Sequence, residues 1–305
     1  MKKILLFTVV IVLIPFFIVT FLVKEEHAKT IKFKINENYK VKIKKDDNSI
    51  IEVPFEEYII GVVAAEMPAE FELEALKAQA VAARSYVLKK IEQNKDKEYD
   101  ILSSTMNQVY IDSNQMKEKW NNKYEEYLSK IKKSVDDTKG EYLTYNGNII
   151  EAFFFSTSSG KTENSEEIFS KSLPYLRSVE SSWDSASPAF NTTNILSLDE
   201  FYFNLNIPYT NELKTEVIET TSTGRIKKIK INNKEFTGNE IRDTFKLKST
   251  FFEIRQNNNN VIIKTKGYGH GVGMSQYGAN GMAKEKYTYD QILKYYYKDV
   301  DISKI

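Results

Sequence analysis

Glu66 differs from most acidic residues of this chain in its surroundings. It follows the apolar run IIGVVAA, whereas most other Asp and Glu residues lie in runs of mixed charge. It also falls near the expected C-terminus of a helix, where the helix dipole disfavours a negative charge. Both effects should raise its pKa, as a general acid working near neutral pH requires. The alternative is that Glu66 forms an ion pair with a nearby cation.

Two cations follow on the next predicted helix. Lys77 and Arg84 are separated by two helical turns and therefore share a face. They could hold an anionic or hydroxylated ligand, one of them could pair with Glu66, or both could lie on an exposed face without a partner.

A second candidate region is the glycine-rich segment GYGHGVG, residues 267–273. Glycine occurs where the backbone needs positive φ or where another group must approach it closely. Glycine at every second position fits neither the dinucleotide fingerprint nor the phosphate-binding loop. His270 in this segment could hydrogen-bond a ligand, act as a base, or brace the turn as a buried histidine.

Composition excludes several kinds of chemistry. The chain has no cysteine and only two histidines, His27 and His270, which excludes disulfides, thiolate nucleophiles and histidine-rich metal sites. The net charge of +1, with no basic stripe, gives no reason to expect nucleic acid as a partner. The segment STSSG lacks the GxSxG geometry of a serine hydrolase. We therefore expect no metal and no cofactor.

The elements that must position these residues can be placed from their patterns. Residues 53–68 and 70–94 are expected to be helices, with Pro54 in the first turn of one and Pro68 forcing its end. Thr288 with Gln291 is expected to begin a last helix. Strand-containing stretches are predicted at 31–45 (strand–turn–strand), 146–164 (turn, buried strand, Ser/Thr/Gly loop), 225–245 (strand, turn and a helix opened by the capping box of Thr237 and Glu240) and across 257–260 (hairpin turn).

The N-terminus reads as a membrane anchor. Residues 4–23 are uncharged and long enough to cross a bilayer as a helix, and no small-residue cleavage site follows them. Lys2 and Lys3 place the stub 1–3 inside and the body outside, after a spacer at 24–34. A cleaved export signal is the alternative, and it also leaves the body outside the cytoplasm. We expect an α+β body over 35–305, mixing helices and β-hairpins, within which residues 165–250 suit a smaller lobe.

Three blocks resemble the stage II sporulation protein D family: VVAAEMPAEFELEALKAQAVAARSYVLKK, AFFFSTSSGKTEN and GYGHGVGMSQYGANGMAKEKYTYDQILKYYY. They occur in the family's order and spacing, and the resemblance covers roughly residues 35–305. It implies a membrane-anchored lytic transglycosylase of peptidoglycan that acts during engulfment, in the mother-cell membrane facing the septal space.

The resemblance also implies roles for single residues. Glu66 would be the catalytic acid/base, and Lys77 and Arg84 would support a substrate groove. The remaining residues expected to bind substrate along that groove are Gln108, Tyr110, Ser156, Ser158, Gly160, His270 and Gln276. Candidate sugar platforms are Tyr86, Tyr110, Tyr268 and Tyr277, each equally suited to the core.

The implied reaction needs one carboxyl group rather than two. The acid protonates the glycosidic oxygen between N-acetylmuramic acid and N-acetylglucosamine, then acts as base for the 6-hydroxyl of the muramic acid, which closes a 1,6-anhydro ring. Stage II sporulation proteins P and M are the amidase partner and membrane organiser that the resemblance suggests. A non-catalytic peptidoglycan-binding modulator of a cell-wall amidase is the competing function.

Two departures from the family pattern stand out. Some relatives bind zinc through cysteine and histidine before a Q-x-Y segment, but this chain has Met106 and Asn107 before Gln108 and Tyr110, so we predict no zinc. Ser158 and Ser159 also stand where the family more often has a serine–glycine pair.

Overall fold

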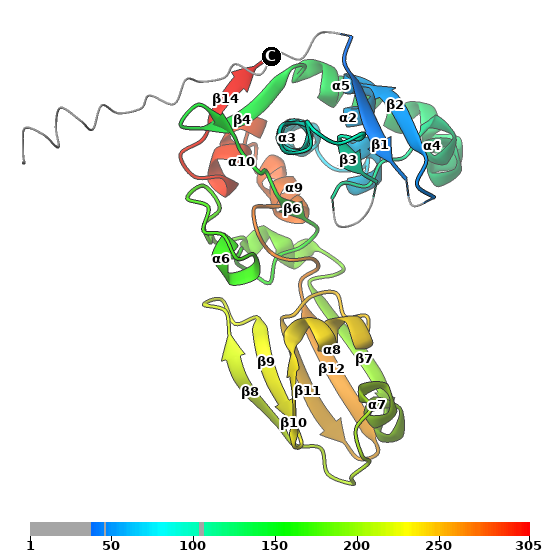
Figure 1. Cartoon of the computed structure of the whole chain (residues 1–305), viewed down its shortest axis with the longest axis vertical. Helices are drawn as coiled ribbons and strands as arrows, with labels where there is room; N and C mark the ends of the chain where they lie inside the picture. Colours follow the sequence, from blue (N-terminus) through cyan, green and yellow to red (C-terminus); the bar gives the residue numbers. More distant parts are fainter. Residues whose placement is uncertain (1–37, 46, 104–106) are drawn as a thin grey trace, which may run out of the picture. The chain divides into compact units, whose positions relative to one another are not determined.

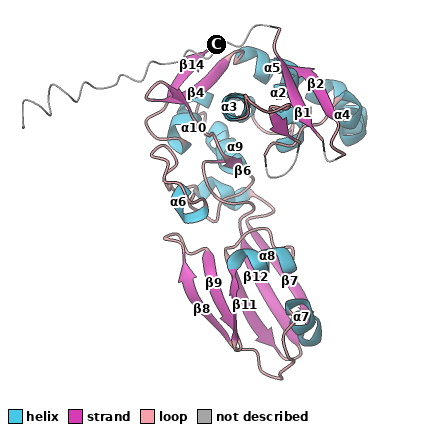
Figure 2. Cartoon of the chain, in the orientation of Figure 1, coloured by secondary structure: helices cyan, strands magenta, loops and turns pink. Residues whose placement is uncertain are grey.

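The computed structural model describes residues 38–45, 47–103 and 107–305. The predicted stub 1–3, anchor 4–23 and spacer 24–34 lie outside these residues, as do Met106 and most of the first predicted strand. Within the described ranges, no helix combines the length and apolar character that crossing a membrane would require. The body mixes helices with several small sheets (Figures 1 and 2), which is the α+β class expected.

The two helices expected to carry the acid and the cations are present. Helix α2 spans Phe55–Glu66 and α3 spans Leu73–Gln93. Helix α3 packs against α2, α5 (Tyr124–Asp137), α9 (Gln276–Lys284) and α10 (Tyr289–Tyr296), and Figure 1 shows it almost end-on among them. Its alanines Ala75, Ala78 and Ala82 are fully buried, and their small side chains permit close helix packing.

The N-terminal hairpin differs from the prediction. Strand β1 (Lys40–Lys44) pairs with β2 (Ile50–Pro54), and β3 (Ile101–Leu102) lies parallel to β1 on its other side. Residues 53 and 54 therefore belong to a strand rather than to the predicted helix. Asn48 supplies the turn with φ +64°, a conformation that asparagine tolerates better than most residues.

A helical segment that sequence patterns did not indicate follows. Helix α4 (Ser113–Trp120) begins with a capping box in which Asp112 and Gln115 satisfy each other's backbone N–H groups, and α5 comes next. Helix α5 packs against both α2 and α3.

Short strands connect the remaining parts of the body. Strand β4 (Glu141–Tyr145) lies between β5 (Asn148–Ile149) and β14 (Asp301–Lys304). Strand β6 (Phe154–Phe155) pairs in parallel with β13 (Met274–Ser275) and so brings the second and third blocks of the sequence together. The strand expected within 146–164 is thus two short pieces. A short helix, α6 (Ser165–Ile168), and a 3₁₀ turn at Ser182–Ala186 follow.

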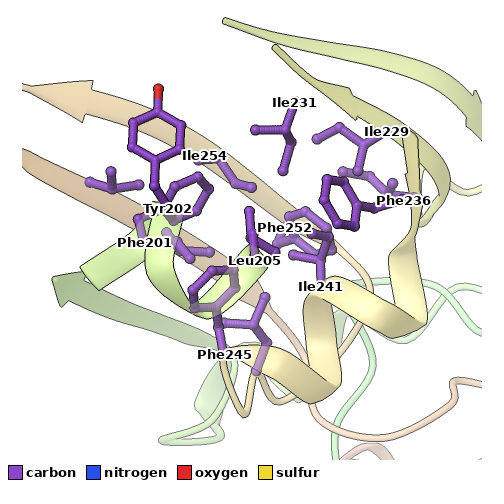
Figure 3. Close-up of a cluster of buried hydrophobic side chains, with 14 of the residues drawn as sticks. Phe201, Tyr202, Leu205, Ile229, Ile231, Phe236, Ile241, Phe245, Phe252 and Ile254 are labelled. Carbon is purple, nitrogen blue, oxygen red and sulfur yellow. The ribbon is translucent and has the colours of Figure 1, made fainter. Parts of the chain in front are cut away.

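Residues 191–266, here called the β lobe, have their own hydrophobic core. The lobe contains β7 (Asn191–Ser197), α7 (Leu198–Leu205), β8 (Thr215–Thr220), β9 (Ile226–Ile231), β10 (Lys234–Thr237), α8 (Gly238–Thr244), β11 (Phe252–Asn257) and β12 (Asn260–Lys266). Its sheets run β10-β9-β8 and β11-β12-β7. Figure 3 shows Phe201, Phe236, Phe245 and their neighbours filling the space between helices and strands.

Several predictions in this region are confirmed. Thr237 and Glu240 form the capping box of α8, β11 and β12 turn at Asn257–Asn260, and Thr288 with Gln291 opens α10. The buried residues of the lobe's core run from Leu198 to Ile263, so they include the β11–β12 hairpin and none of residues 165–190.

Candidate active site around Glu66

Glu66 is the last residue of α2. Met67 has extended backbone angles, because the following Pro68 sterically disfavours the helical conformation at this position. The helix therefore ends at Glu66 itself. Val62 and Tyr58, one and two turns earlier on the same face, are fully buried, while Glu66 itself is partly exposed. The carboxylate therefore sits at the edge of an apolar interior.

Burial raises the pKa of Glu66 above its usual value. Three groups oppose this by favouring the ionised form: the backbone N–H of Val109, 2.9 Å from Oε1, the side-chain amide of Gln276, and the charge of Lys119. Lys119 extends from α4, and its Nζ donates to the carbonyl oxygens of Ala64 (2.8 Å) and Ala65 (3.2 Å). It thus compensates part of the dipole at the end of α2.

Tyrosines line the inner side of this site. The rings of Tyr58 and Tyr110 are stacked with centroids 5.7 Å apart. Gly61 makes room for this stack, since a Cβ there would lie 2.3 Å from Cε2 of Tyr110. Burial raises the pKa values of Tyr58 and Tyr86, and the charge of Glu66 raises both further.

Arg84 lies inside the fold, at the opposite end of α2 from Glu66. Its side chain has no exposed area; it forms an ion pair with Glu56 at 2.8 Å and donates to the carbonyl of Glu141. Glu56 precedes Glu66 by ten residues of helix, roughly 15 Å. Arg84 therefore ties the start of α2 to β4, and its side chain has no exposed area in this structure.

Lys77 is also engaged within the fold. Its Nζ pairs with Glu74 at 2.9 Å and with Asp137 at 3.1 Å. Neither expected cation pairs with Glu66, so the alternative in which one of them forms a structural ion pair with this carboxylate is wrong.

Gln108 supports the site from inside. It is almost fully buried, accepts the hydroxyl of Tyr58 at 3.0 Å and donates to the carbonyl of Ala83 at 3.2 Å. Its side chain fixes the segment whose next residue, Val109, bonds Glu66. Tyr110 is partly exposed and lines a surface hollow of about 360 Å³ together with Ser103 and Asp112.

The loop of residues 156–160 (STSSG), here called the serine loop, is organised by a carboxylate that the sequence did not indicate. Asp184 is fully buried and accepts hydrogen bonds from the backbone and hydroxyl of Ser158 (both 2.9 Å) and from the hydroxyls of Ser181 and Ser275 (both 2.5 Å). Ser158 is thus committed to the fold. Ser156 remains partly exposed, and Gly160 has open space around its Cα.

The alternating glycines serve close contact between two chain segments. All four have positive φ, and a Cβ on Gly267, Gly269 or Gly273 would lie within 3.0 Å of atoms in residues 153–158. A Cβ on Gly271 would meet the buried Arg225–Glu163 ion pair. The glycine-rich segment therefore packs closely against residues 153–158 and the Arg225–Glu163 pair, and its glycines face other parts of the protein.

His270 braces the glycine-rich segment. Its ring lies among Phe153, Phe155 and Phe169 at centroid distances of 5.5–6.0 Å, and Nδ1 accepts the backbone N–H of Val272 at 3.1 Å. Burial, with the charge of Arg225, lowers the pKa of His270 to about 4. The histidine is thus neutral at physiological pH and its Nδ1 is occupied.

Gln276 does lie at the acid. It is the first residue of α9 and is nearly buried; its side-chain amide favours the ionised form of Glu66, and its Nε2 donates to Oε1 of Gln79 at 3.4 Å. The sequence did not indicate four residues that interact with the predicted site residues: Val109 and Lys119 at Glu66, Gln79 at Gln276 and Asp184 at Ser158. Lys119 lies in an ordinary mixed-charge run and Val109 acts through its backbone, so neither carried a readable signal.

The arrangement can hold and release one proton. Among the described residues, the groups that shift the pKa of Glu66 include no second carboxylate. Within the same residues, no three His, Cys, Asp or Glu side chains gather to hold a metal ion. A single acid with a raised pKa, held by the backbone N–H of Val109 and favoured in its ionised form by Gln276 and the charge of Lys119, suits general acid–base chemistry.

Comparisons with known proteins match the part of the chain that contains Glu66 to a described family. Residues 44–145 match the family model described as stage II sporulation protein, and residues 114–273 match a domain of unknown function. Stage II sporulation protein D of Bacillus subtilis is 43% identical over 262 residues, covering 84% of this chain and 76% of the relative. That of Bacillus amyloliquefaciens is 42% identical with the same coverage. An amidase enhancer of Bacillus subtilis is 32% identical and is covered over 39% of its length.

Proposed function

Because the chain belongs to the stage II sporulation protein D family, we propose that it is a lytic transglycosylase of peptidoglycan that acts in sporulation. Its substrate is the bond between N-acetylmuramic acid and N-acetylglucosamine in glycan strands, and its products carry 1,6-anhydromuramyl ends. The observation that carries the proposal is the single partly buried carboxyl of Glu66, with its raised pKa and its fixed donors.

In the first step Glu66, in its protonated form, gives its proton to the glycosidic oxygen while the bond to C1 breaks. The carboxylate that remains then takes the proton of the muramic acid's 6-hydroxyl as that oxygen attacks C1. The ring closes, the proton returns to Glu66, and no water is consumed. General acid–base catalysis of this kind supplies ~10²–10⁴-fold, and substrate binding and distortion supply the rest.

The surroundings of Glu66 suit both halves of this cycle. Burial favours the protonated acid, while Val109, Gln276 and Lys119 stabilise the carboxylate formed after proton transfer. A retaining hydrolase would need a second carboxyl about 5–5.5 Å away. The described residues that affect Glu66 include none, and this supports transglycosylation over hydrolysis.

The substrate-facing residues of the proposal are those that keep accessible surface or open space near the site. Tyr110, Ser156 and Gly160 keep accessible surface, and the proposal assigns these three to the substrate. Lys77, Arg84, Gln108, Ser158 and His270 act instead as structural supports, because their polar groups are engaged within the fold.

We further propose that residues 4–23 anchor the protein in the membrane with its body outside the cytoplasm. Stage II sporulation proteins P and M would be its amidase partner and membrane organiser. An amidase that removes stem peptides would supply the strands on which Glu66 acts. Co-purification from sporulating cells with and without residues 4–23 tests the anchor and both partners.

The experiment for the activity uses glycan strands freed of stem peptides, incubated with the purified protein and analysed by mass spectrometry. Anhydromuramyl ends support the proposal. Ordinary reducing muramyl ends would indicate a hydrolase and a second carboxylate.

A second function is favoured by the similarity to the protein named amidase enhancer. The body would then bind glycan and modulate an amidase without cutting strands itself. No cleavage of peptide-free strands, combined with faster amidase turnover in the presence of the protein, would support this role.

A further inference from the structure

Gln79 is a buried polar residue whose presence the fold alone does not explain. It lies in α3 and has no accessible surface. Its Oε1 accepts Nε2 of Gln276 at 3.4 Å, but its own Nε2 has no hydrogen-bond partner. A buried amide nitrogen without a partner lowers stability, and an apolar side chain of similar length would avoid this cost.

The unpartnered nitrogen follows from what Gln276 must do. In its ionised form Glu66 only accepts hydrogen bonds, so Gln276 favours that form by turning Nε2 toward the carboxylate. The same Nε2 also faces Gln79, which must therefore present its oxygen. The nitrogen of Gln79 then points the other way, into the interior. Turning Gln276 over would instead set its oxygen against the oxygen of Gln79.

We propose that Gln79 is a positioning residue that holds the amide of Gln276 in the orientation that donates to Glu66. The inference rests on the proposed function, in which Glu66 must be stabilised as a carboxylate midway through the reaction. Gln79 cannot touch substrate, because it has no accessible surface, and so it acts only through Gln276.

Other groups also face Glu66 and remain in place when Gln79 is changed. They are Lys119 from α4, the hydroxyls of Tyr58 in α2 and Tyr86 in α3, and the backbone N–H of Val109. A change in the titration of Glu66 in a Gln79 variant therefore reports on the amide of Gln276.

The test follows the Glu66 carboxyl by carbon-13 NMR titration in wild type, Gln79→Met, Gln276→Met and the double variant, with Glu66→Gln to assign the signal. Gln79→Met is expected to raise the pKa of Glu66, because the donated hydrogen bond weakens. In the Gln276→Met background, Gln79→Met should cause no further rise in the pKa of Glu66, since the amide through which Gln79 acts is already absent. The melting temperature should stay the same or rise, because the unpartnered nitrogen is gone.

An unmoved titration in Gln79→Met, or an equal shift that persists in the Gln276→Met background, would overturn the proposal. A fall in melting temperature with unchanged titration would show a merely structural role. Gln79→Asn, which keeps an amide but withdraws its oxygen, is the second variant if Gln79→Met does not fold, with the same expected shift. The titration does not depend on strand cleavage, so failure of the proposed activity would be seen separately. Where strands are cleaved, kcat should fall roughly tenfold with KM unchanged.

Discussion

The backbone N–H of Val109 donates a hydrogen bond of 2.9 Å to Oε1 of Glu66. It joins the end of α2 to a segment 43 residues further along the chain. The carboxylate is thus held from outside its own helix, so its position does not depend on its own rotamer preferences alone. Burial raises its pKa while this bond lowers it, and the balance suits a group that must both give and take a proton.

Replacing Glu66 with Gln should abolish strand cleavage and preserve the fold. The variant keeps the shape and the accepting oxygen but has no proton to transfer, so we expect a loss of at least ~10²-fold in kcat. Product analysis with circular dichroism of the same sample measures both effects. A folded variant that still cleaves would show that another group is the acid.

The same variant tests the burial of the carboxyl through pH. The folded-state pKa of Glu66 is raised, so its contribution to stability is complete below the ordinary value of 4.5 and is lost as pH rises through the folded pKa. At neutral pH Glu66→Gln should therefore melt at the same or a higher temperature than wild type. The difference should vanish below about pH 4.5. A melting temperature lowered equally at all pH values would contradict the assigned environment.

Lys119→Met should raise the pKa of Glu66 and weaken the end of α2. The ammonium contacts two terminal carbonyls and its charge favours ionised Glu66, so its loss acts on both. We expect ~0.3–1 kcal/mol in unfolding free energy. The descending limb of the pH–rate profile should move to higher pH. Lys117→Met, on the same helix, changes the net charge equally and is the control. If both variants shifted the pKa of Glu66 equally, net charge rather than the position of Lys119 would explain the shift.

Gly273→Ala should destabilise the body far more than Gly160→Ala. Both glycines have positive φ, but a Cβ at 273 would lie 2.0 Å from the carbonyl oxygen of Phe153, while nothing lies within 4 Å at 160. We expect a cost on the order of 3 kcal/mol at 273 and about 1 kcal/mol at 160. Urea unfolding measures both. Equal costs would mean that backbone strain alone, without close contact, explains the glycines.

His270 should remain neutral to about pH 4. Its pKa is lowered from 6.5, so the unfolded chain binds the proton more tightly and stability should fall as pH decreases from 6.5 toward 4. Proton NMR of the imidazole measures the titration, and His27 provides the second signal in the chain. A midpoint near 6.5 would restore His270 as a candidate base facing solvent.

The sequence led us to propose Glu66 as the acid, but it did not indicate which distant groups contact Glu66 or organise the neighbouring serine-rich loop. Glu66 could be predicted because the apolar run before it and Pro68 after it are local signals. Lys119, Gln79 and Asp184 reach their partners only after distant segments pack together, and their neighbours in sequence say nothing of this. Helical spacing correctly placed Lys77 and Arg84 on one face of a helix. It could not show that the side chain of Arg84 is buried.

The fold divides in a similar way. The capping boxes at Thr237 and Thr288 are local patterns, and the structure confirms them. Helices α4 and α5 and the exact partner of β1 were not predicted, because α4 is short and polar and strand pairing is decided by turns and burial. The glycines showed that something approached closely, while the serine loop as the approaching segment emerged only from the structure.

The most direct test of the central claim is cleavage of peptide-free glycan strands in oxygen-labelled water by wild type and Glu66→Gln. The account predicts anhydromuramyl ends without label from wild type and no new ends from the variant. Labelled reducing ends, or equal cleavage by the variant, would contradict the assignment of Glu66 as the single acid/base of a transglycosylase.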